Sequence, residues 1–510
     1  MIRRASAVLL GTLALAVACG GEQAPPRQPA SPPPVAVAPD AGPPDPLGPR
    51  PEVGEPALYT PPVPVSYERD GGLRVWLLAR HAVPLVSMQL VVPAGSAYDP
   101  EGKEGLAAMT ANMLDEGAGA RGPLEIARDI DRLGATLRTG AQADYAYVHL
   151  TTLKKNLAPA LEIFGDVVAR PRMSPVEFKR VHDLWTNQLR ARQSDPQAVA
   201  GVVVRRKVYQ RGPYAHPVDG TLASAAKVGL DDVKKLYASR WRPDKALLVV
   251  VGDVTREELD PLLDRALGSW KAPKTPPPPD DPWEKTIPPS SSVGDPPAVG
   301  RRVFVVDRPD APQSVIAVGR TGPGGSEARL STCPLVRVNA ALGGSFTSRL
   351  NQKLREEHGW SYGARSRFEW NRVGGAFVAS AAVHTEHTGE ALAAMIAEIE
   401  GVAKNGLTEE ETAKTRQLAR AELVETFETI DATAVRLART AGVGLTPQDE
   451  VQMSRAIDGA TRKQLNDLAG TFLDLSRRSV VVIVGPRAKI EPQLAAIGIT
   501  NIERATPEGD

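Results

Sequence analysis

Cysteine is scarce in this chain, with two residues among 510. If Cys19 is modified, as its context suggests below, Cys333 is left without a partner and no disulfide can stabilise the fold. Stability must then come from the packing of a hydrophobic core. Cys333 has no histidine-rich signature upstream of it, so we expect a small buried side chain and not a nucleophile.

An excess of charge of either sign is also missing. The sequence has 61 basic and 60 acidic residues, which gives a formal net charge of +1. This balance provides no bulk attraction to nucleic acid or to an anionic surface, so any partner must be recognised by a local site. The 42% hydrophobic and 24% charged content is ordinary for a globular protein, and the length allows about two to four domains.

The apolar run near the N-terminus is too short to be a settled membrane span. It follows Arg3 and Arg4 and extends from residue 5 to residue 18. A short basic segment followed by such a run is typical of an export signal. We therefore predict a signal peptide over residues 1–18.

Two modes of processing fit the end of this signal. Residues 16–18 form an Ala-x-Ala site for ordinary cleavage, whereas residues 15–19 resemble a bacterial lipobox, in which Cys19 is lipidated and becomes the new N-terminus. Gly20 after the cysteine resembles the sorting signal for the outer membrane. We expect an exported periplasmic lipoprotein anchored in the outer membrane, with an unmodified Cys19 at the mature N-terminus as the alternative.

Two proline-rich segments divide the rest of the chain. Residues 19–65 and 272–299 contain few large apolar side chains and cannot bury enough surface to order themselves. The first is expected to be a lipid-anchored tether with a reach on the order of 100 Å, and the second a linker between domains. They delimit two blocks, 66–271 and 300–496, followed by a tail over 497–510.

The two blocks look like copies of one unit. Each begins with two apolar stretches separated by a proline and closes on a β-branched run that ends in glycine. The matching stretches are 73–80 with 302–308, 85–90 with 314–318, and 246–252 with 479–485. A duplication is the simplest explanation.

The periodicity within a block predicts its fold class. Residues 121–133 and 174–193 carry helical apolar spacing, while 144–150 alternate as a strand does. We therefore predict an α+β protein of two homologous tandem domains. Each domain is expected to be a mainly antiparallel sheet with helices packed on one face.

Several stretches, in their order and spacing, resemble the insulinase/pitrilysin family of zinc metallopeptidases, which includes the processing-peptidase subunits of mitochondria. The resemblance extends over both blocks and implies the fold of that family. The matching stretches are 95–99, 105–107, 212–221, 237–243 and 250–254 in the first block, and 344–350, 355–356 and 359–362 in the second.

The zinc motif of the family is missing. Its members place H-x-x-E-H on the helix after Gly-Leu-Ala, where this sequence has Ala108, Ala111 and Asn112 at the histidine and glutamate positions. The third family ligand, a glutamate, falls near Asn187 or Gln188. Methyl and amide groups neither hold Zn²⁺ nor act as a general base. We expect no metal in this chain and no peptidase activity from it alone.

The histidines offer no clear substitute for the missing motif. His384 and His387 form the only close pair, and we expect them in a solvated loop between a strand and the next helix. His216 lies in a stretch where the family tolerates other polar residues, so we interpret it as structural. A peptidase with an unorthodox metal site is the least favoured hypothesis.

A second family feature is retained. Catalytic relatives use an Arg and a Tyr, seven residues apart in the C-terminal unit, to hold the substrate near the scissile bond, and Arg355 and Tyr362 have this separation. An arginine can bind peptide carbonyls and a phenol can stabilise an oxyanion. The alternative is that Arg355 is a surface charge on a helix and Tyr362 a core aromatic.

The resemblance leaves two functions open. The first is a non-catalytic, substrate-binding subunit of a heterodimeric zinc endopeptidase that acts on peptides in the cell envelope. A metal-bearing homologue would then supply the zinc, and the peptide would be held by strand addition to a sheet edge. The second is an inert peptide-binding or scaffold lipoprotein with the same fold. A homodimer also remains possible, and nothing indicates nucleic acid as a partner.

Overall fold

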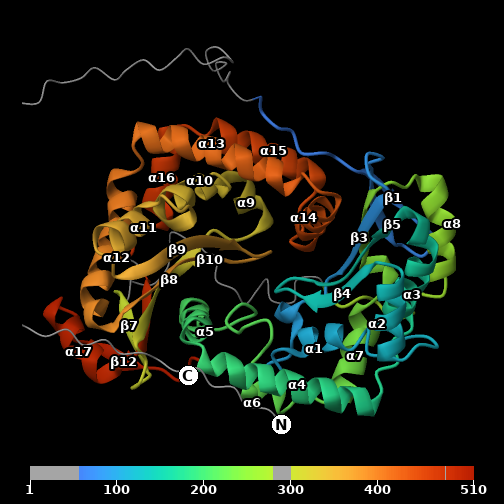
Figure 1. Ribbon diagram of the computed structural model, residues 1–510, viewed down its shortest axis with the longest axis horizontal. Helices are drawn as coiled ribbons and strands as arrows, with labels where there is room; N and C mark the ends of the chain where they lie inside the picture. The colour runs from blue at the N-terminus through green and yellow to red at the C-terminus, as the bar shows by residue number, and fades with distance from the viewer. Residues whose placement is uncertain (1–56, 280–299, 477) are drawn as a thin grey trace, which may run out of the picture. The chain divides into compact units, whose positions relative to one another are not determined.

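The computed structural model describes residues 57–279, 300–476 and 478–510 (Figure 1). Residues 57–510 form one compact unit. The predicted signal peptide, Cys19 and most of the predicted tether and linker lie outside the described residues. None of the helices within the described ranges is both long and apolar enough to cross a bilayer.

Each half of the compact unit contains one six-stranded mixed sheet. In the first half the spatial order is β1-β2-β6-β3-β5-β4, and in the second it is β12-β7-β11-β8-β10-β9. The strands are β1 (Val65–Glu68), β2 (Arg74–Ala79), β3 (Leu85–Val92), β4 (Thr136–Ala141), β5 (Ala146–Leu153), β6 (Leu247–Gly252), β7 (Arg302–Asp307), β8 (Gln313–Gly322), β9 (Ser361–Trp370), β10 (Gly375–His384), β11 (Val480–Gly485) and β12 (Ile502–Arg504).

The sheets repeat one topology, apart from one edge. In both, the closing strand of the half pairs in parallel with the first core strand and antiparallel with the second, as β6 does with β2 and β3. At the outer edge, β1 runs antiparallel to β2, whereas β12 runs parallel to β7. The segment 497–510, expected to be a tail, therefore contains a strand, and Ile502 pairs with Val303. This strand covers backbone groups of β7 that an open edge would expose.

The helices surround these sheets. Those of the first half are α1 (Leu106–Asn112), α2 (Pro123–Arg132), α3 (Leu157–Ala169), α4 (Pro175–Ser194), α5 (Pro196–Tyr209), α6 (Leu222–Ala225), α7 (Leu230–Arg240) and α8 (Arg256–Leu267). Those of the second half are α9 (Ser326–Thr332), α10 (Leu335–Asn339), α11 (Arg349–Asn351), α12 (Thr388–Asn405), α13 (Glu409–Thr426), α14 (Ile430–Gly442), α15 (Pro447–Gly459), α16 (Arg462–Phe472) and α17 (Arg487–Ala496).

Local sequence explains where these elements begin. Helix α4 follows Ser174, whose Oγ accepts a hydrogen bond from the backbone N–H of Glu177 at 3.2 Å, with proline at the first helical position. The helices predicted over 121–133 and 174–193 are confirmed as α2 and α4, and the strand predicted over 144–150 is β5. The α+β prediction of two homologous domains is confirmed.

The second face of each sheet is covered by a helix from the other half, which the prediction of helices on one face did not include. Helix α14 packs on β3 and β6, and α5 packs on β8 and β11. The β-strands alternate their side chains, so a strand such as β6 places Leu248 and Val250 in its own core and Val249 and Val251 against α14. Both faces are apolar, and both need cover.

Candidate functional site

Helix α1 carries the positions that correspond to the zinc motif. It begins after Gly105, whose φ of 95° suits glycine, and a Cβ there would lie 2.6 Å from the Trp185 ring of α4. The carboxylate of Asp99 accepts hydrogen bonds from the backbone N–H groups of Gly105 at 2.7 Å and Ala107 at 2.8 Å. The Asp99 hydrogen bonds hold the first turn of α1, and the close approach at Gly105 places this turn against Trp185 of α4.

The side chains on this helix do not fit a metal. Ala108 is half-buried and Asn112 is exposed, one turn apart on the same face, while Ala111 is fully buried in the core of the first half. Asn187 and Gln188 are both exposed on α4. Alkyl and amide groups are poor ligands for Zn²⁺, and the described residues contain no cluster of three His, Cys, Asp or Glu that could hold a metal ion.

Of the three histidines singled out from the sequence, His387 and His216 have local partners. His384 ends β10 and is exposed, and His387 lies in the short 3₁₀ turn that leads into α12, where its Nδ1 lies 2.8 Å from a carboxylate oxygen of Glu390. The Nδ1 atom of His216 lies 3.2 Å from the carbonyl oxygen of Pro217, and burial lowers the pKa of this imidazole. These contacts agree with local structural roles.

Arg355 and Tyr362 lie together. The Arg355 guanidinium lies 5.2 Å from the centre of the Tyr362 ring and 4.6 Å from that of Phe346. Tyr362 is 88% exposed and Phe346 66% exposed, which is unusual for large aromatic side chains. Tyr362 is therefore not a core aromatic. The arrangement presents one guanidinium and two aromatic faces to solvent; cation–π contacts join the three groups, and Arg355 also pairs with Glu356 at 3.3 Å.

Irregular backbone sets the direction of both side chains. Arg355 lies in the π-helical segment η5 (Gln352–Glu357), which follows α11. Tyr362 is the second residue of the edge strand β9, where the pairing with β10 shifts its register between Ala381 and Val383. Such bulges and π-helical turns change the aim of a side chain and are frequent next to functional sites.

A cavity of about 630 Å³ lies beside this pair. Its lining includes Arg355, Tyr362 and Phe346 from the second half, together with Gln197 from the first turn of α5. Sequence reasoning missed Phe346 and Gln197. Phe346 lies inside a stretch that carries the family resemblance, but nothing in the sequence shows that its ring is exposed; Gln197 reaches the cavity because α5 packs on the opposite sheet.

A groove lies along α2 and the start of the edge strand β4, with one side formed by α4. Carboxylates predominate among its charged residues: Asp115, Glu116, Glu125, Asp131 and Glu177, against Arg180. Burial raises the pKa of Asp115 to about 6, and the neighbouring Glu116 acts in the same direction. This edge of the first sheet is therefore acidic, in contrast to the Arg355 cavity at the edge of the second.

Comparison with known proteins identifies the family. Residues 74–222 match the family described as Insulinase (Peptidase family M16), and residues 227–418 match the one described as Peptidase M16 inactive domain. The chain belongs to the insulinase, or M16, family. The predicted resemblance is thereby confirmed across both halves of the protein.

The M16 relatives carry two kinds of name. An uncharacterized zinc protease of Mycobacterium leprae is 25% identical over 426 residues, which cover 82% of this chain and 91% of that protein. A non-peptidase homolog of Helicobacter pylori is 22% identical over 311 residues, or 61% of this chain and 66% of its own length. The structure of a peptidase M16 inactive domain from Pseudomonas fluorescens has a TM-score of 0.72 at 22% identity, and covers 83% of this chain and 98% of that one. The fold is that of M16 proteins.

Proposed function

We propose that this chain is the non-catalytic, substrate-binding subunit of a heterodimeric M16 zinc endopeptidase that acts on peptides in the cell envelope. The observation that carries the proposal is the exposed group of Arg355, Tyr362 and Phe346 on a cavity of about 630 Å³, in a chain whose α1 offers no metal ligand. The metal would belong to a homologous partner, and the predicted export signal supports the place of action.

The chemistry of the group supports a role in holding a peptide. A guanidinium donates to carbonyl oxygens in a fixed geometry, and the phenol of Tyr362 can donate to an oxygen that gains negative charge. The edge strand β9, which carries Tyr362, has no neighbour on its outer side among the described strands. A substrate strand could add to this edge, so that main-chain bonds give affinity while Arg355 and Tyr362 fix the register.

The test compares two arginines that lie in consecutive elements. The full chain is purified with and without a metal-bearing M16 homologue from the same cell envelope, and peptide hydrolysis is measured. Arg355→Ala is expected to lower the rate of the mixture by about 100-fold, the effect of removing one well-placed donor. Arg367→Ala is the control, because Arg367 is exposed on β9 and pairs with Glu369 at 2.8 Å, away from Tyr362. Its rate should remain within about twofold.

Tyr362→Phe separates the hydroxyl from the ring. The ring contact with Arg355 is kept, so peptide affinity should persist while the rate falls. If Arg355→Ala leaves the rate of the mixture unchanged, the shared site is rejected. A chain that binds peptide but recruits no metal-bearing homologue would instead be the inert peptide-binding lipoprotein.

A further inference from the structure

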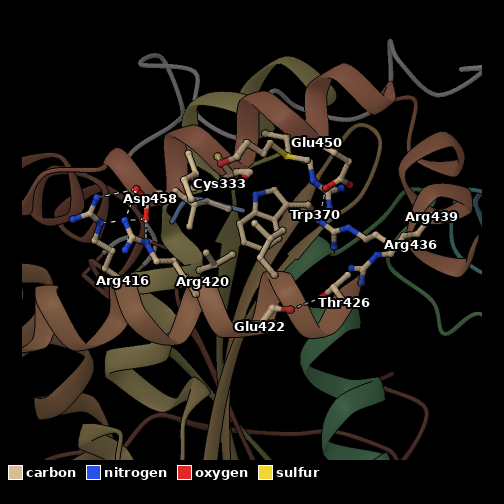
Figure 2. Close-up of a pocket in the computed structure, with 18 residues that line it drawn as sticks. Cys333, Trp370, Arg416, Arg420, Glu422, Thr426, Arg436, Arg439, Glu450 and Asp458 are labelled. Atoms are coloured by element: carbon tan, nitrogen blue, oxygen red, sulfur yellow. Dashed lines mark hydrogen bonds and ion pairs between the residues drawn. The ribbon is translucent and has the colours of Figure 1, made fainter. Parts of the chain in front are cut away.

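A second cavity, of about 250 Å³, lies within the second half of the chain (Figure 2). Side chains from α9, α10, α13, α14 and α15 line it, together with Trp370 of β9 and Leu58. Leu58 belongs to a segment that is fixed on this half, because Ser454 donates to the carbonyl oxygen of Tyr59 and the Tyr59 ring packs on Phe427. None of these residues takes part in the site around Arg355.

The main feature of this cavity is a buried arginine without a partner for one of its nitrogens. Arg329 is only 9% exposed, and its Nη1 atom has no hydrogen-bond partner among the described residues. Its guanidinium lies 5.8 Å from the centre of the Trp370 ring. A buried charge with an unpaired donor costs free energy, so native structures rarely keep one without a reason.

Two further arginines increase the free-energy cost of burying the charge of Arg329. Arg436 and Arg439 lie three residues apart on one face of α14, and their charges, after burial itself, lower the pKa of Arg329 to about 10. Glu450 is the carboxylate at this end: it pairs with Arg436 at 2.9 Å and also accepts a hydrogen bond from Thr440. Three cations therefore lie near one buried carboxylate, and the other glutamate of the lining, Glu422, is exposed on α13, so positive charge is left for a ligand to neutralise.

At the opposite end of the cavity the arginines are paired with a carboxylate. Arg416 and Arg420 both pair with Asp458, and Figure 2 shows this group on one side and Arg436, Arg439 and Glu450 on the other. Cys333 and Trp370 lie between the two ends. The ion pairs with Asp458 satisfy the first group, so the demand for an anion is confined to the end that contains Arg329.

Apolar side chains form much of the wall. They include Val336, Leu423, Met453 and Ile457, which would contact the body of a ligand and leave only one of its ends to the arginines. The Cys333 thiol donates to the carbonyl oxygen of Leu330 at 3.3 Å, and burial raises its pKa to about 12. It remains a protonated, unreactive part of the wall. The cavity therefore combines a cationic end with an apolar interior.

We propose that this cavity binds a small organic carboxylate with an apolar body, whose carboxylate is held by Arg329 with Arg436 and Arg439. An arginine fork matches a carboxylate in geometry and charge, and such charge-assisted bonds are strong when buried. The volume suits a molecule of modest size. Such a carboxylate could be a free aliphatic acid or the carboxyl end of a short peptide, and both present the same chemistry to the three arginines.

The experiment measures the thermal unfolding of the isolated full chain, so it needs neither a partner nor peptidase activity. Octanoate and N-acetyl-leucine represent the free acid and the peptide end. At least one of them should raise Tm by about 2 °C or more at saturation. Octanamide, which has the same apolar body but no charge, should have no effect. Equal shifts with octanamide, or with inorganic phosphate alone, would overturn the proposal, as would no shift with either carboxylate.

Two buried arginines provide a matched pair of variants. Arg337 is 1% exposed, and its guanidinium donates to backbone carbonyl oxygens that include those of Thr412 and Ala460. Arg337→Met should therefore lower Tm without ligand. Arg329→Met removes an unpaired charge, so it should leave Tm unchanged or raise it, and it should weaken carboxylate binding at least about tenfold. Arg439→Gln, at an exposed position, should weaken binding without affecting folding. If Arg329→Met lowers Tm as Arg337→Met does, Arg329 is structural and the proposal fails.

Discussion

Helices α5 and α14 each cover a face of the sheet in the other half of the protein, but they do so with different side chains. Helix α5 covers the second sheet with valines such as Val203 and Val204, against strand residues that include Phe304 and Val482. Helix α14 covers the first sheet with Leu437 and other apolar residues, but its first turn also makes polar contacts. There Asp431 accepts hydrogen bonds from His149 and Thr151 of β5, and from Ser87 of β3.

The two helix–sheet contacts also differ in the position of the glycine that permits close approach. On the second sheet the glycine belongs to the strand: a Cβ at Gly319 would lie 2.6 Å from a methyl group of Val204. On the first sheet it belongs to the helix: a Cβ at Gly442 would lie 2.2 Å from the Tyr145 ring. The duplicated halves have thus kept the exchange of helices while changing the residues that permit it. The packing of one helix from each half on the sheet of the other half is therefore a property of the fold, and it does not depend on the missing zinc ligands.

Truncation of the apolar contact should have the largest effect. Leu437 is fully buried between α14 and the first sheet. Leu437→Ala should reduce the free energy of unfolding by about 2–5 kcal/mol, because it removes buried methyl groups and leaves a cavity. Val435 is 42% exposed on the same helix, so Val435→Ala should change it by no more than about 0.5 kcal/mol. Urea unfolding of both variants gives the comparison; equal losses would show that α14 is not anchored through Leu437.

A smaller effect is expected from filling the close approach at Gly442. Gly442→Ala places a methyl group against the Tyr145 ring, and such overpacking costs about 1–3 kcal/mol. Gly459, the last residue of α15, has nothing within 4 Å of the same methyl position. Gly459→Ala should stabilise the protein by up to about 1 kcal/mol, because alanine favours the helix. If both variants gain stability, the contact between α14 and Tyr145 is looser than the structure indicates.

The contrast also shows what the sequence could reveal. The β-branched runs at 246–252 and 479–485 predicted the last strand of each block, which the structure places in the middle of its sheet, and their repetition supported the duplication. The valines of α5 predict an apolar helix face, but helical spacing cannot tell which sheet that face covers. Arg355 and Tyr362 were found through the family resemblance. A spacing of seven residues does not by itself bring two side chains together, because a π-helical turn and a bulge set their directions here. Arg329 gave no sequence signal, because its surroundings depend on the packing of α9 against α15.

The smallest effect should come from Asp431, and it should depend on pH. The hydrogen bond with His149 is the main cause that lowers the pKa of this carboxyl below its ordinary value of 3.8, with Thr151 and Ser87 acting in the same direction. A carboxyl with a lowered pKa in the folded state stabilises the protein above the unfolded pKa, and this contribution is lost as pH falls. Asp431→Asn should therefore be less stable than the native chain at pH 7, by an amount that shrinks as the pH falls below about 4.

A surface carboxylate provides the control for this prediction. Asp467 is 64% exposed and pairs with Lys463 within α16, so Asp467→Asn should change stability little at either pH. The comparison requires urea unfolding of the native chain and both variants at pH 7 and at the lowest pH where all remain folded. A difference for Asp431→Asn that stays constant with pH would mean that the amide loses packing and not charge. In α5 the capping carboxylate of Asp195 accepts a hydrogen bond from the N–H of Gln197 in its own helix. Between the halves, α5 contributes the ion pair of Arg205 with Glu369 of β9 at 2.8 Å, and α14 contributes Asp431. A pH-independent result would show that the contacts of Asp431 do not act through its charge.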